Sequence, residues 1–368
     1  MRTNVETPRT SAERACIPRL RERPARTGIA RHEGDCSDDK RAEFQGGVEP
    51  HRDIVIDLGG GFRLEGGESL QDPRLTVRVQ GPEDAPLLVV AGGISAGRKI
   101  ADAADASGWW RTIVGAGAAI DLARFRVLGF DFLPGEERAV RTITADDQAR
   151  ALAIALDAIN GSSVYGFLGA SYGGVAGLAF AARHPKRLAK LCVISAAARP
   201  DPMATALRGV QRRIIAMATA SGRPAEGVAL ARELAMTTYR GAEEFAERFS
   251  SHPEGPRAGE AYDVCAYLQS RGRAYAERMG AARYVSLSDS LDRSRVDPTA
   301  IAAECLFIAV EGDRLVPARD VAATAAAVSG PAACFAFASR YGHDAFLCDT
   351  ERFAGRLKRF FEGGTHVA

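Results

Sequence analysis

The stretch that most restricts how this chain can fold is residues 169–174, Gly-Ala-Ser-Tyr-Gly-Gly. An apolar run at 163–168 precedes it and an alanine- and leucine-rich stretch at 175–184 follows it, which predicts a strand, a tight turn and a helix. Small residues two before and two after Ser171 let the backbone turn sharply enough to hold the serine hydroxyl clear of a sheet. Ser171 is therefore a candidate nucleophile, although glycine and serine also cluster in ordinary turns.

Two later apolar runs lead to a carboxylate and an imidazole. The run at 305–310 ends in a loop that carries Asp313, and the run at 333–338 ends in a loop that carries His343. Separately, each could be a helix cap or a solvated loop residue. Together with Ser171 they follow strands in the order serine, aspartate, histidine, which is the order of the α/β-hydrolase fold. The three residues are thus predicted to form a catalytic triad.

Strand-like and helix-like segments alternate through much of the chain. The runs at 75–79, 87–91, 125–130 and 191–195 have strand patterns, and Thr144 is placed to cap a helix that reaches about residue 160. This alternation predicts an α/β class, with a mainly parallel, doubly wound sheet. We expect the core at 51–198 and 300–368. Residues 199–299 show helical patterns only, and we expect them to form an all-helical lid insertion.

The loop after the 87–91 run contains Gly92 and Gly93, followed by Ile94. In a sheet of this kind, that loop supplies one backbone N–H to an oxyanion hole, and the residue after the nucleophile supplies the second. We therefore predict an oxyanion hole made by the amides of Ile94 and Tyr172. Paired glycines suit any tight turn, so an ordinary turn is an equal alternative for the glycine pair alone.

Composition separates this chain from several classes of protein. Its hydrophobic content is 46%, its charged content 26% and its formal net charge +2, which predicts an ordinary enzyme with no nucleic-acid partner. No apolar stretch has the length of a membrane span or the layout of a signal peptide, so we expect no membrane association. The seven cysteines are odd in number and lack a C-x-x-C pair, which predicts free thiols and a cytoplasmic location.

Residues 1–50 differ from the rest of the chain. Arginine, proline and acidic residues alternate there without helical or strand periodicity, which predicts a disordered N-terminal extension. A start codon assigned too far upstream is an alternative explanation, so these residues need not belong to the native protein.

Beyond the triad, the chain resembles the homoserine O-acyltransferases of the α/β-hydrolase fold. The resemblance extends from about residue 75 onwards, and its most specific part is Gly-His-Asp-Ala-Phe-Leu at 342–347. The other matching segments are Gly-Trp-Trp at 108–110, residues 113–121, the turn at 169–174, Val-Gln-Arg at 210–212, and Thr-Tyr-Arg at 238–240 with Phe249.

This resemblance implies transfer of an acyl group from an acyl-CoA co-substrate to the hydroxyl of L-homoserine, in methionine biosynthesis. It implies a ping-pong reaction through Ser171, with no bound cofactor and no metal, and a homodimer formed through the helical insertion. By position in the family motifs, Arg232 would bind the acceptor carboxylate and Asp344 its ammonium group. From the residues alone, a solvated surface arginine is the favoured interpretation of Arg232, and Asp344 could be an N-terminal cap on the last helix.

The acyl donor is the least determined part of the prediction. Members of the family use acetyl-CoA or succinyl-CoA, and a succinyl group brings a second carboxylate that requires a cation once it is enclosed. Arg98 and Lys99 directly follow the oxyanion loop, where a solvated pair at the start of a helix is at least an equal alternative. Of the two, we predict that Arg98 binds this carboxylate and favours succinyl-CoA. Acetyl-CoA as donor, serine as acceptor, an esterase with the same triad and a non-catalytic binding protein remain alternatives.

Overall fold

The computed structural model describes residues 50–253, 255–258 and 262–363. Apart from its last residue, the predicted extension at 1–50 lies outside the described residues. Within them, the main feature is an eight-stranded sheet with the order β1-β2-β6-β3-β7-β8-β9-β10. The strands are β1 (His51–Asp57), β2 (Arg74–Gln80), β3 (Leu87–Ala91), β6 (Arg126–Phe130), β7 (Val164–Ala170), β8 (Leu188–Ile194), β9 (Glu304–Glu311) and β10 (Ala332–Ala338).

The sheet confirms the predicted fold class. β1 and β2 pair antiparallel, as do β2 and β6, and every further neighbouring pair from β6 to β10 is parallel. Strand β1 was not predicted. It lies at the edge of the sheet and is mostly exposed, so its apolar run is only three residues long, at 54–56. A separate two-stranded ribbon pairs β4 (Val114–Gly115) with β5 (Ile120–Asp121).

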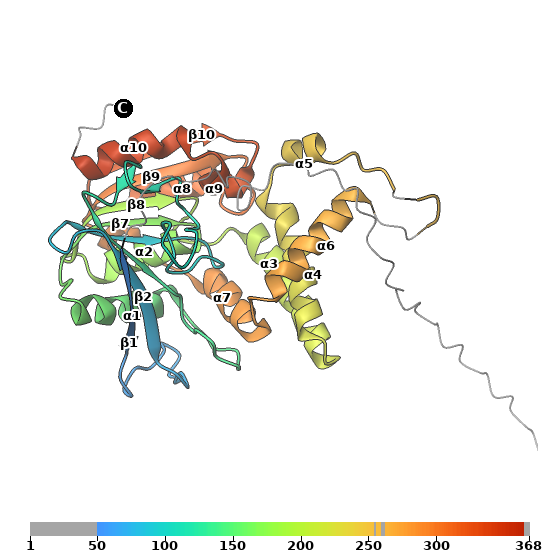
Figure 1. Cartoon of the computed structure of the whole chain (residues 1–368), viewed down its shortest axis with the longest axis horizontal. Helices are drawn as coiled ribbons and strands as arrows, with labels where there is room; N and C mark the ends of the chain where they lie inside the picture. Colours follow the sequence, from blue (N-terminus) through green and yellow to red (C-terminus); the bar gives the residue numbers. More distant parts are fainter. Residues whose placement is uncertain (1–49, 254, 259–261, 364–368) are drawn as a thin grey trace, which may run out of the picture. The chain divides into compact units, whose positions relative to one another are not determined.

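Each face of the sheet is buried by a different set of helices (Figure 1). Leu152 of α1 (Ala145–Ala158) and Leu178 of α2 (Tyr172–Arg183) belong to the core on one face, together with residues of α8 (Ala318–Ala327). Phe360 of α10 (Glu351–Glu362) and Trp110 belong to the core on the other face. Because both faces are covered, the central strands can be almost entirely apolar.

Helix α1 begins where the sequence predicts. Thr144 is its N-cap and accepts a hydrogen bond of 3.1 Å from the amide of Asp147, whose carboxylate accepts one of 3.0 Å from the amide of Thr144. This reciprocal pair is a capping box, which satisfies amides that the first turn of a helix leaves without partners.

The chain between β8 and β9 forms helices. They are α3 (Pro202–Ala220), α4 (Pro224–Tyr239), α5 (Ala242–Arg248), α6 (Asp263–Ala276) and α7 (Ala281–Arg293). A short helical turn, η1 (Pro298–Ala300), precedes β9, and the C-terminal part adds η2 (Gly342–Asp344) and α9 (Ala345–Cys348).

Helix α7 joins the helical insertion to the main core. Its Leu287 is fully buried within the core on the α1 and α2 face. Its Ser290 Oγ lies 2.7 Å from the hydroxyl of Tyr172, which also accepts a hydrogen bond of 3.2 Å from Gln148. Tyr172 is completely buried, and this burial raises its pKa to about 12, so the phenol stays neutral. The residue after the nucleophile therefore anchors α7.

Replacing Tyr172 by phenylalanine is expected to lower the free energy of unfolding by about 1–3 kcal/mol, because buried polar groups of Gln148 and Ser290 lose a hydrogen-bond partner. Urea unfolding followed by circular dichroism measures the change. Tyr262→Phe is the matched control, since Tyr262 is 44% exposed. Equal stability of the two variants would contradict the anchoring role.

Candidate active site

Ser171 lies on a strained turn between β7 and α2. Its backbone angles are φ 53° and ψ −122°, a conformation that non-glycine residues rarely adopt. A β-carbon on Gly169 would lie 2.4 Å from the carbonyl oxygen of Gly173, and one on Gly173 would lie 2.3 Å from that of Ala91. Both distances are impossible contacts, so the small residues that flank Ser171 are sterically required.

The structure brings the three predicted triad residues together. Nε2 of His343 lies 2.9 Å from Oγ of Ser171, and Nδ1 of His343 lies 2.7 Å from Oδ2 of Asp313. The other carboxylate oxygen of Asp313 accepts hydrogen bonds of 2.8 and 3.0 Å from the amides of Leu315 and Val316. These amides fix the carboxylate, which in turn orients the imidazole so that Nε2 can accept the serine proton.

The negative charge of Asp313 affects the pKa of His343. Burial by itself would lower the pKa of His343, but the ionised carboxylate of Asp313 and its hydrogen bond raise that pKa above the usual 6.5. The imidazolium that forms when His343 accepts a proton is therefore stabilised.

This raised pKa predicts the pH dependence of the enzyme. Protonated His343 cannot accept the proton of Ser171, so kcat/KM for a substrate attacked by Ser171 should fall on the acid side with an apparent pKa above 6.5. Initial rates across a pH series measure this limb. Enzyme returned from acid to neutral buffer before assay controls for unfolding, and an acid limb centred below 6.5 would contradict the prediction.

The predicted oxyanion donors lie on either side of Ser171. The amide of Gly173 donates to the carbonyl of Gly92 at 2.7 Å, which ties the turn after β7 to the loop after β3. A β-carbon on Gly93 would lie 3.9 Å from Oγ of Ser171, so this loop passes directly beside the nucleophile. Among the described residues, the amides of Ile94 and Tyr172 have no recorded acceptor, which leaves both able to donate to a developing oxyanion.

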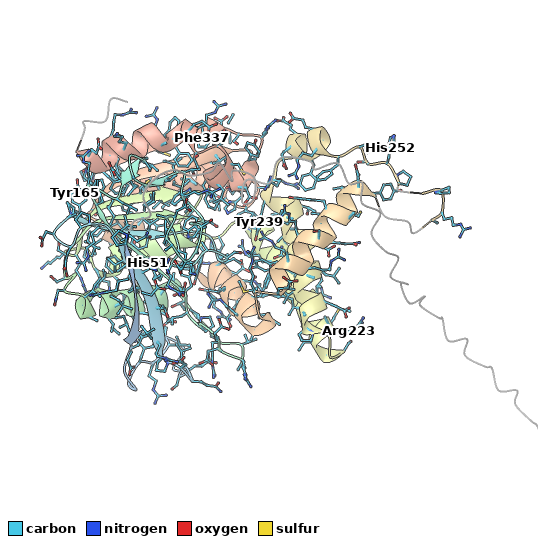
Figure 2. All side chains as sticks on the ribbon, viewed as in Figure 1. His51, Tyr165, Arg223, Tyr239, His252 and Phe337 are labelled. Carbon is cyan, nitrogen blue, oxygen red and sulfur yellow. The ribbon has the colours of Figure 1, made fainter. Side chains whose placement is uncertain are left out.

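Arg232 lies beside the triad without an anionic partner. Its guanidinium stacks on Tyr239, 5.0 Å from the ring centre, and on Tyr275, 4.7 Å from the ring centre. Tyr239, the last residue of α4 (Figure 2), has its ring 6.0 Å from that of His343. Within the described part of the chain, no hydrogen bond or ion pair of Arg232 is recorded. The arrangement favours a cation directed toward a bound anion rather than a solvated surface arginine.

Asp344, next to His343, is 13% exposed and pairs with Arg240, whose Nε donates to its Oδ2 at 2.9 Å. Asp344 occupies the N-cap position of α9, but its side chain makes no capping hydrogen bond. Asp344 is thus an N-cap by position only, and its Oδ1 has no recorded partner among the described residues.

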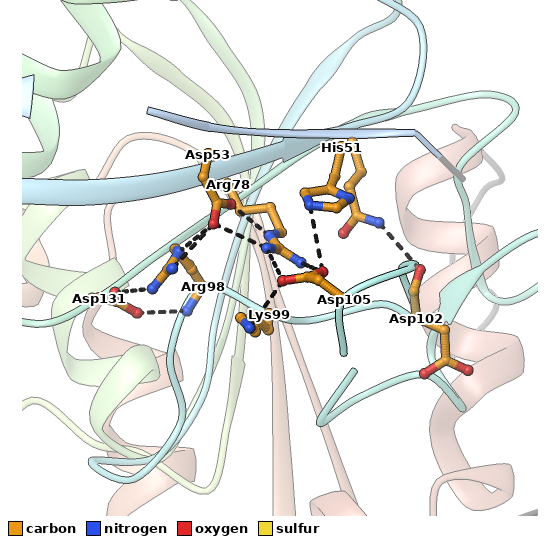
Figure 3. A network of polar contacts seen from close by, with 9 residues as sticks. His51, Asp53, Arg78, Arg98, Lys99, Asp102, Asp105 and Asp131 are labelled. Atoms are coloured by element: carbon orange, nitrogen blue, oxygen red, sulfur yellow. Dashed lines mark hydrogen bonds and ion pairs between the residues drawn. The ribbon is translucent and has the colours of Figure 1, made fainter. Parts of the chain in front are cut away.

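Arg98 is not the free cation that the prediction requires, because two carboxylates of the protein already pair with it. Its Nη1 donates to Asp131 at 2.6 Å, and its Nε and Nη2 lie 3.1 and 3.0 Å from Asp53 (Figure 3). Its backbone amide also donates to Asp131, at 2.9 Å. Two carboxylates thus balance its charge, which argues against Arg98 as the group that binds a substrate carboxylate. The sequence places Arg98 after the oxyanion loop but gives no sign of these distant partners.

Sequence reasoning missed Tyr275, which connects the two sides of this site. It is 2% exposed, stacks with Arg232, and its hydroxyl accepts a hydrogen bond of 3.1 Å from Ser95 in the oxyanion loop. No motif marks Tyr275, because its role depends on a contact between residues 180 positions apart.

Three further predictions concern metals, membranes and thiols. Across the described ranges there is no cluster of three potential metal-binding side chains. In the same part of the chain, no helix combines the length and apolarity needed to cross a bilayer. Cys192, Cys265, Cys305 and Cys334 are free thiols. Cys348, however, takes part in a disulfide, so the expectation of free thiols is wrong for Cys348.

Comparison with known proteins agrees with this geometry. A family model described as the alpha/beta hydrolase fold matches residues 86–347. A homoserine O-succinyltransferase of Xanthomonas campestris pv. campestris is 41% identical over 281 residues, which are 76% of each chain. A serine O-succinyltransferase of Litchfieldella anticariensis is 30% identical, over 83% of this chain and 97% of the relative.

The crystal structure of a homoserine O-acetyltransferase from Bacillus anthracis superposes with a TM-score of 0.77 at 15% identity, covering 88% of this chain and all of the other. At that identity the likeness shows the fold. The 41% identity over three quarters of both chains goes further. Taken with a triad on the expected turn and loops, it places the chain in the homoserine O-acyltransferase family of the α/β-hydrolase fold.

Proposed function

We propose that this enzyme transfers a succinyl group from succinyl-CoA to the hydroxyl of L-homoserine. The observation that carries the proposal is the position of Arg232, a cation without an anionic partner beside the triad. An esterase that uses water as its second substrate has no need of such a cation, whereas an amino-acid acceptor brings a carboxylate to this place. The two relatives that support the succinyl donor are both named succinyltransferases.

The reaction proceeds in two halves. His343 takes the proton of Ser171, the serine oxygen attacks the thioester carbon, and CoA leaves as a thiol after His343 returns the proton to its sulfur. The homoserine hydroxyl then gives its proton to His343 and attacks the acyl-enzyme ester, and the proton returns to Ser171. In both halves the amides of Ile94 and Tyr172 stabilise the negative oxygen, each by about 3 kcal/mol in comparable sites.

The acceptor is held at both ends of its amino-acid group. Arg232 binds its carboxylate and Asp344, through the oxygen that Arg240 does not occupy, binds its ammonium group. Arg232 stacks on Tyr239, whose ring lies 6.0 Å from that of His343, and Asp344 follows His343 in the chain. Both groups therefore lie close to the base that takes the proton of the acceptor hydroxyl.

A matrix of two donors and three acceptor conditions tests the proposal. Succinyl-CoA and acetyl-CoA are each incubated with homoserine, with serine and with buffer alone, and both free CoA and the O-acylated product are measured. We expect the highest kcat/KM with succinyl-CoA and homoserine. Consumption of acyl-CoA at the same rate without an acceptor would indicate a hydrolase. A preference for acetyl-CoA would show that the proposed donor is wrong, and a preference for serine would show that the proposed acceptor is wrong.

Replacement of Arg232 by methionine is expected to lower kcat/KM for homoserine by about 100-fold, since an enclosed carboxylate without its cation costs roughly 2–5 kcal/mol. The first half-reaction, measured as a burst of free CoA without acceptor, should change little. Arg213→Met on α3 is the control. Equal losses in both half-reactions would show that Arg232 does not bind the acceptor.

We further propose that the enzyme is a homodimer formed through α3. Met203, Val210 and Met217 are 66%, 46% and 72% exposed, and they recur every seven residues on this helix. An exposed apolar stripe of this kind suits the same stripe of a second copy. Met217→Glu should convert a dimer to a monomer in sedimentation equilibrium, and an unaltered mass would rule out this interface.

The proposed reaction belongs to methionine biosynthesis, because O-acylation activates the homoserine hydroxyl as a leaving group for sulfur incorporation. We place it in the cytoplasm, a proposal that the free thiols of Cys192, Cys265, Cys305 and Cys334 support and the disulfide of Cys348 opposes. Acyl-CoA acts as a co-substrate, with no other cofactor required by the chemistry.

A further inference from the structure

Arg283, near the start of α7, is a half-buried cation whose guanidinium is only partly used. Its Nη1 donates to the carbonyls of Phe132 and Gly135, at 2.9 and 3.0 Å. Both carbonyls belong to the loop that follows β6. A guanidinium has five N–H donors, and among the described residues no partner is recorded for Nε or Nη2 of Arg283. The edge of the fork that can bind a carboxylate with two hydrogen bonds is therefore available.

Two carboxylates, Asp131 and Glu136, lie near Arg283. Asp131 is already paired, because one of its oxygens accepts from the amide of Arg98 and the other from its guanidinium. Glu136 is exposed, and neither Asp131 nor Glu136 forms an ion pair with Arg283.

Asp131 also belongs to a charge-balanced network (Figure 3). Arg78 is 1% exposed and bridges Asp53 and Asp105, Arg98 bridges Asp53 and Asp131, and Lys99 pairs with Asp105, next to His51. Three aspartates thus face three lysine or arginine cations. Because this network has no negative charge to spare, Asp131 is not free to pair with Arg283, and burial lowers the pKa of Arg283 from the usual value.

Arg283 lies close to the side chain of Tyr172, the residue that follows Ser171. Four and seven residues further along α7, Leu287 and Ser290 share its face of the helix, and Ser290 contacts the hydroxyl of Tyr172 at 2.7 Å. The ring of Phe132, whose carbonyl binds Arg283, packs 4.7 Å from the ring of Tyr172. Tyr172 is the residue whose amide faces the oxyanion. Arg232, in contrast, lies on the side of His343.

Arg232 and Arg283 are thus two cations that can bind two different carboxylates, one on the acceptor and one on the acyl group. In a succinyl group, two methylenes separate the carboxylate from the reacting carbonyl, so the carboxylate must stay close to the oxyanion hole when Ser171 is acylated. Arg98, the cation predicted from sequence, is held by Asp53 and Asp131. We propose that Arg283 binds the distal carboxylate of the succinyl group and thereby selects the acyl donor; this rests on the acyl transfer proposed above.

The test compares three donors in the first half-reaction, so that acceptor binding does not enter. Succinyl-CoA is compared with acetyl-CoA and with butyryl-CoA, which has the same number of acyl carbons but ends in a methyl group. In Arg283→Gln, kcat/KM for CoA release from succinyl-CoA should fall about 30-fold or more, while acetyl-CoA and butyryl-CoA change less than about threefold. Arg283→Lys keeps the charge without the fork and should give an intermediate loss with succinyl-CoA only.

Arg278→Gln is the matched control, because Arg278 is an exposed arginine five residues earlier. It should leave all three donors unchanged. If Arg283→Gln and Arg283→Lys lose kcat/KM equally with all three donors, Arg283 only supports the loop after β6. That result would overturn the inference about Arg283 but not the proposed acyl transfer. If wild-type enzyme releases CoA from acetyl-CoA but not from succinyl-CoA, the donor and the role of Arg283 are both wrong. If it releases CoA from none, the proposed function itself fails.

Discussion

Replacing Ser171 by alanine should lower kcat for acyl transfer by about 10⁴-fold or more, because the acyl group then has no oxygen to which it can be attached. Loss of the nucleophile of a triad removes most of the rate enhancement by itself, since the three residues act as a unit. Rates of CoA release with succinyl-CoA and homoserine measure the effect. Mass spectrometry of the protein after incubation with succinyl-CoA alone should detect a succinyl adduct in the wild type and none in Ser171→Ala.

Ser163→Ala is the control for this experiment, since Ser163 is exposed just before β7. It should retain both turnover and the adduct. The size of the alanine side chain fits the turn, because Ser171 and alanine share the same β-carbon, so Ser171→Ala should fold normally. Turnover within tenfold of the wild type, or an adduct on a different residue, would show that Ser171 is not the nucleophile.

Asp313→Asn is expected to have the second largest effect, a loss of about 10⁴-fold in kcat. An amide at this position can donate to Nδ1 of His343, which leaves the proton on Nε2 and prevents that nitrogen from accepting the serine proton. The charge that raises the pKa of His343 is also removed, so any residual activity should show its acid limb at lower pH than in the wild type. Steady-state rates over a pH series measure both changes.

The control replaces Asp84, an exposed aspartate in the loop before β3, by asparagine. Asp84→Asn should match the wild type in rate and in pH profile. General unfolding of Asp313→Asn would also lower the rate, but it would not shift the acid limb of the pH profile to lower pH. An acid limb that stays in place would refute electrostatic control of His343 by Asp313.

Tyr172 has two roles, one through its backbone and one through its side chain. Its amide faces the oxyanion, while its hydroxyl reaches Ser290 on α7. A side chain without a hydroxyl, such as Met or Leu, could not make that contact. In this chain the residue after the nucleophile thus helps to place the helix that carries Arg283.

The sequence alone predicts those elements whose structure depends on residues close together in the chain. Apolar runs predicted β3 and β7, because a strand buried on both faces is apolar throughout. Thr144 and Asp147 predicted the start of α1, because a cap is made within one turn. The turn around Ser171 and the order of Asp313 and His343 also follow from short patterns, and the shared sheet edge then brings the three side chains together.

Charge pairing was decided only by the tertiary structure. Arg98, Arg232 and Arg283 look alike in sequence, and adjacency to the oxyanion loop favoured Arg98. In the folded chain Arg98 meets Asp53 and Asp131, whereas Arg232 stacks on tyrosines and Arg283 binds backbone carbonyls. Whether a cation can bind a substrate depends on which anions the fold brings within about 4 Å of it. Such contacts join residues far apart in the chain, and no local pattern encodes them.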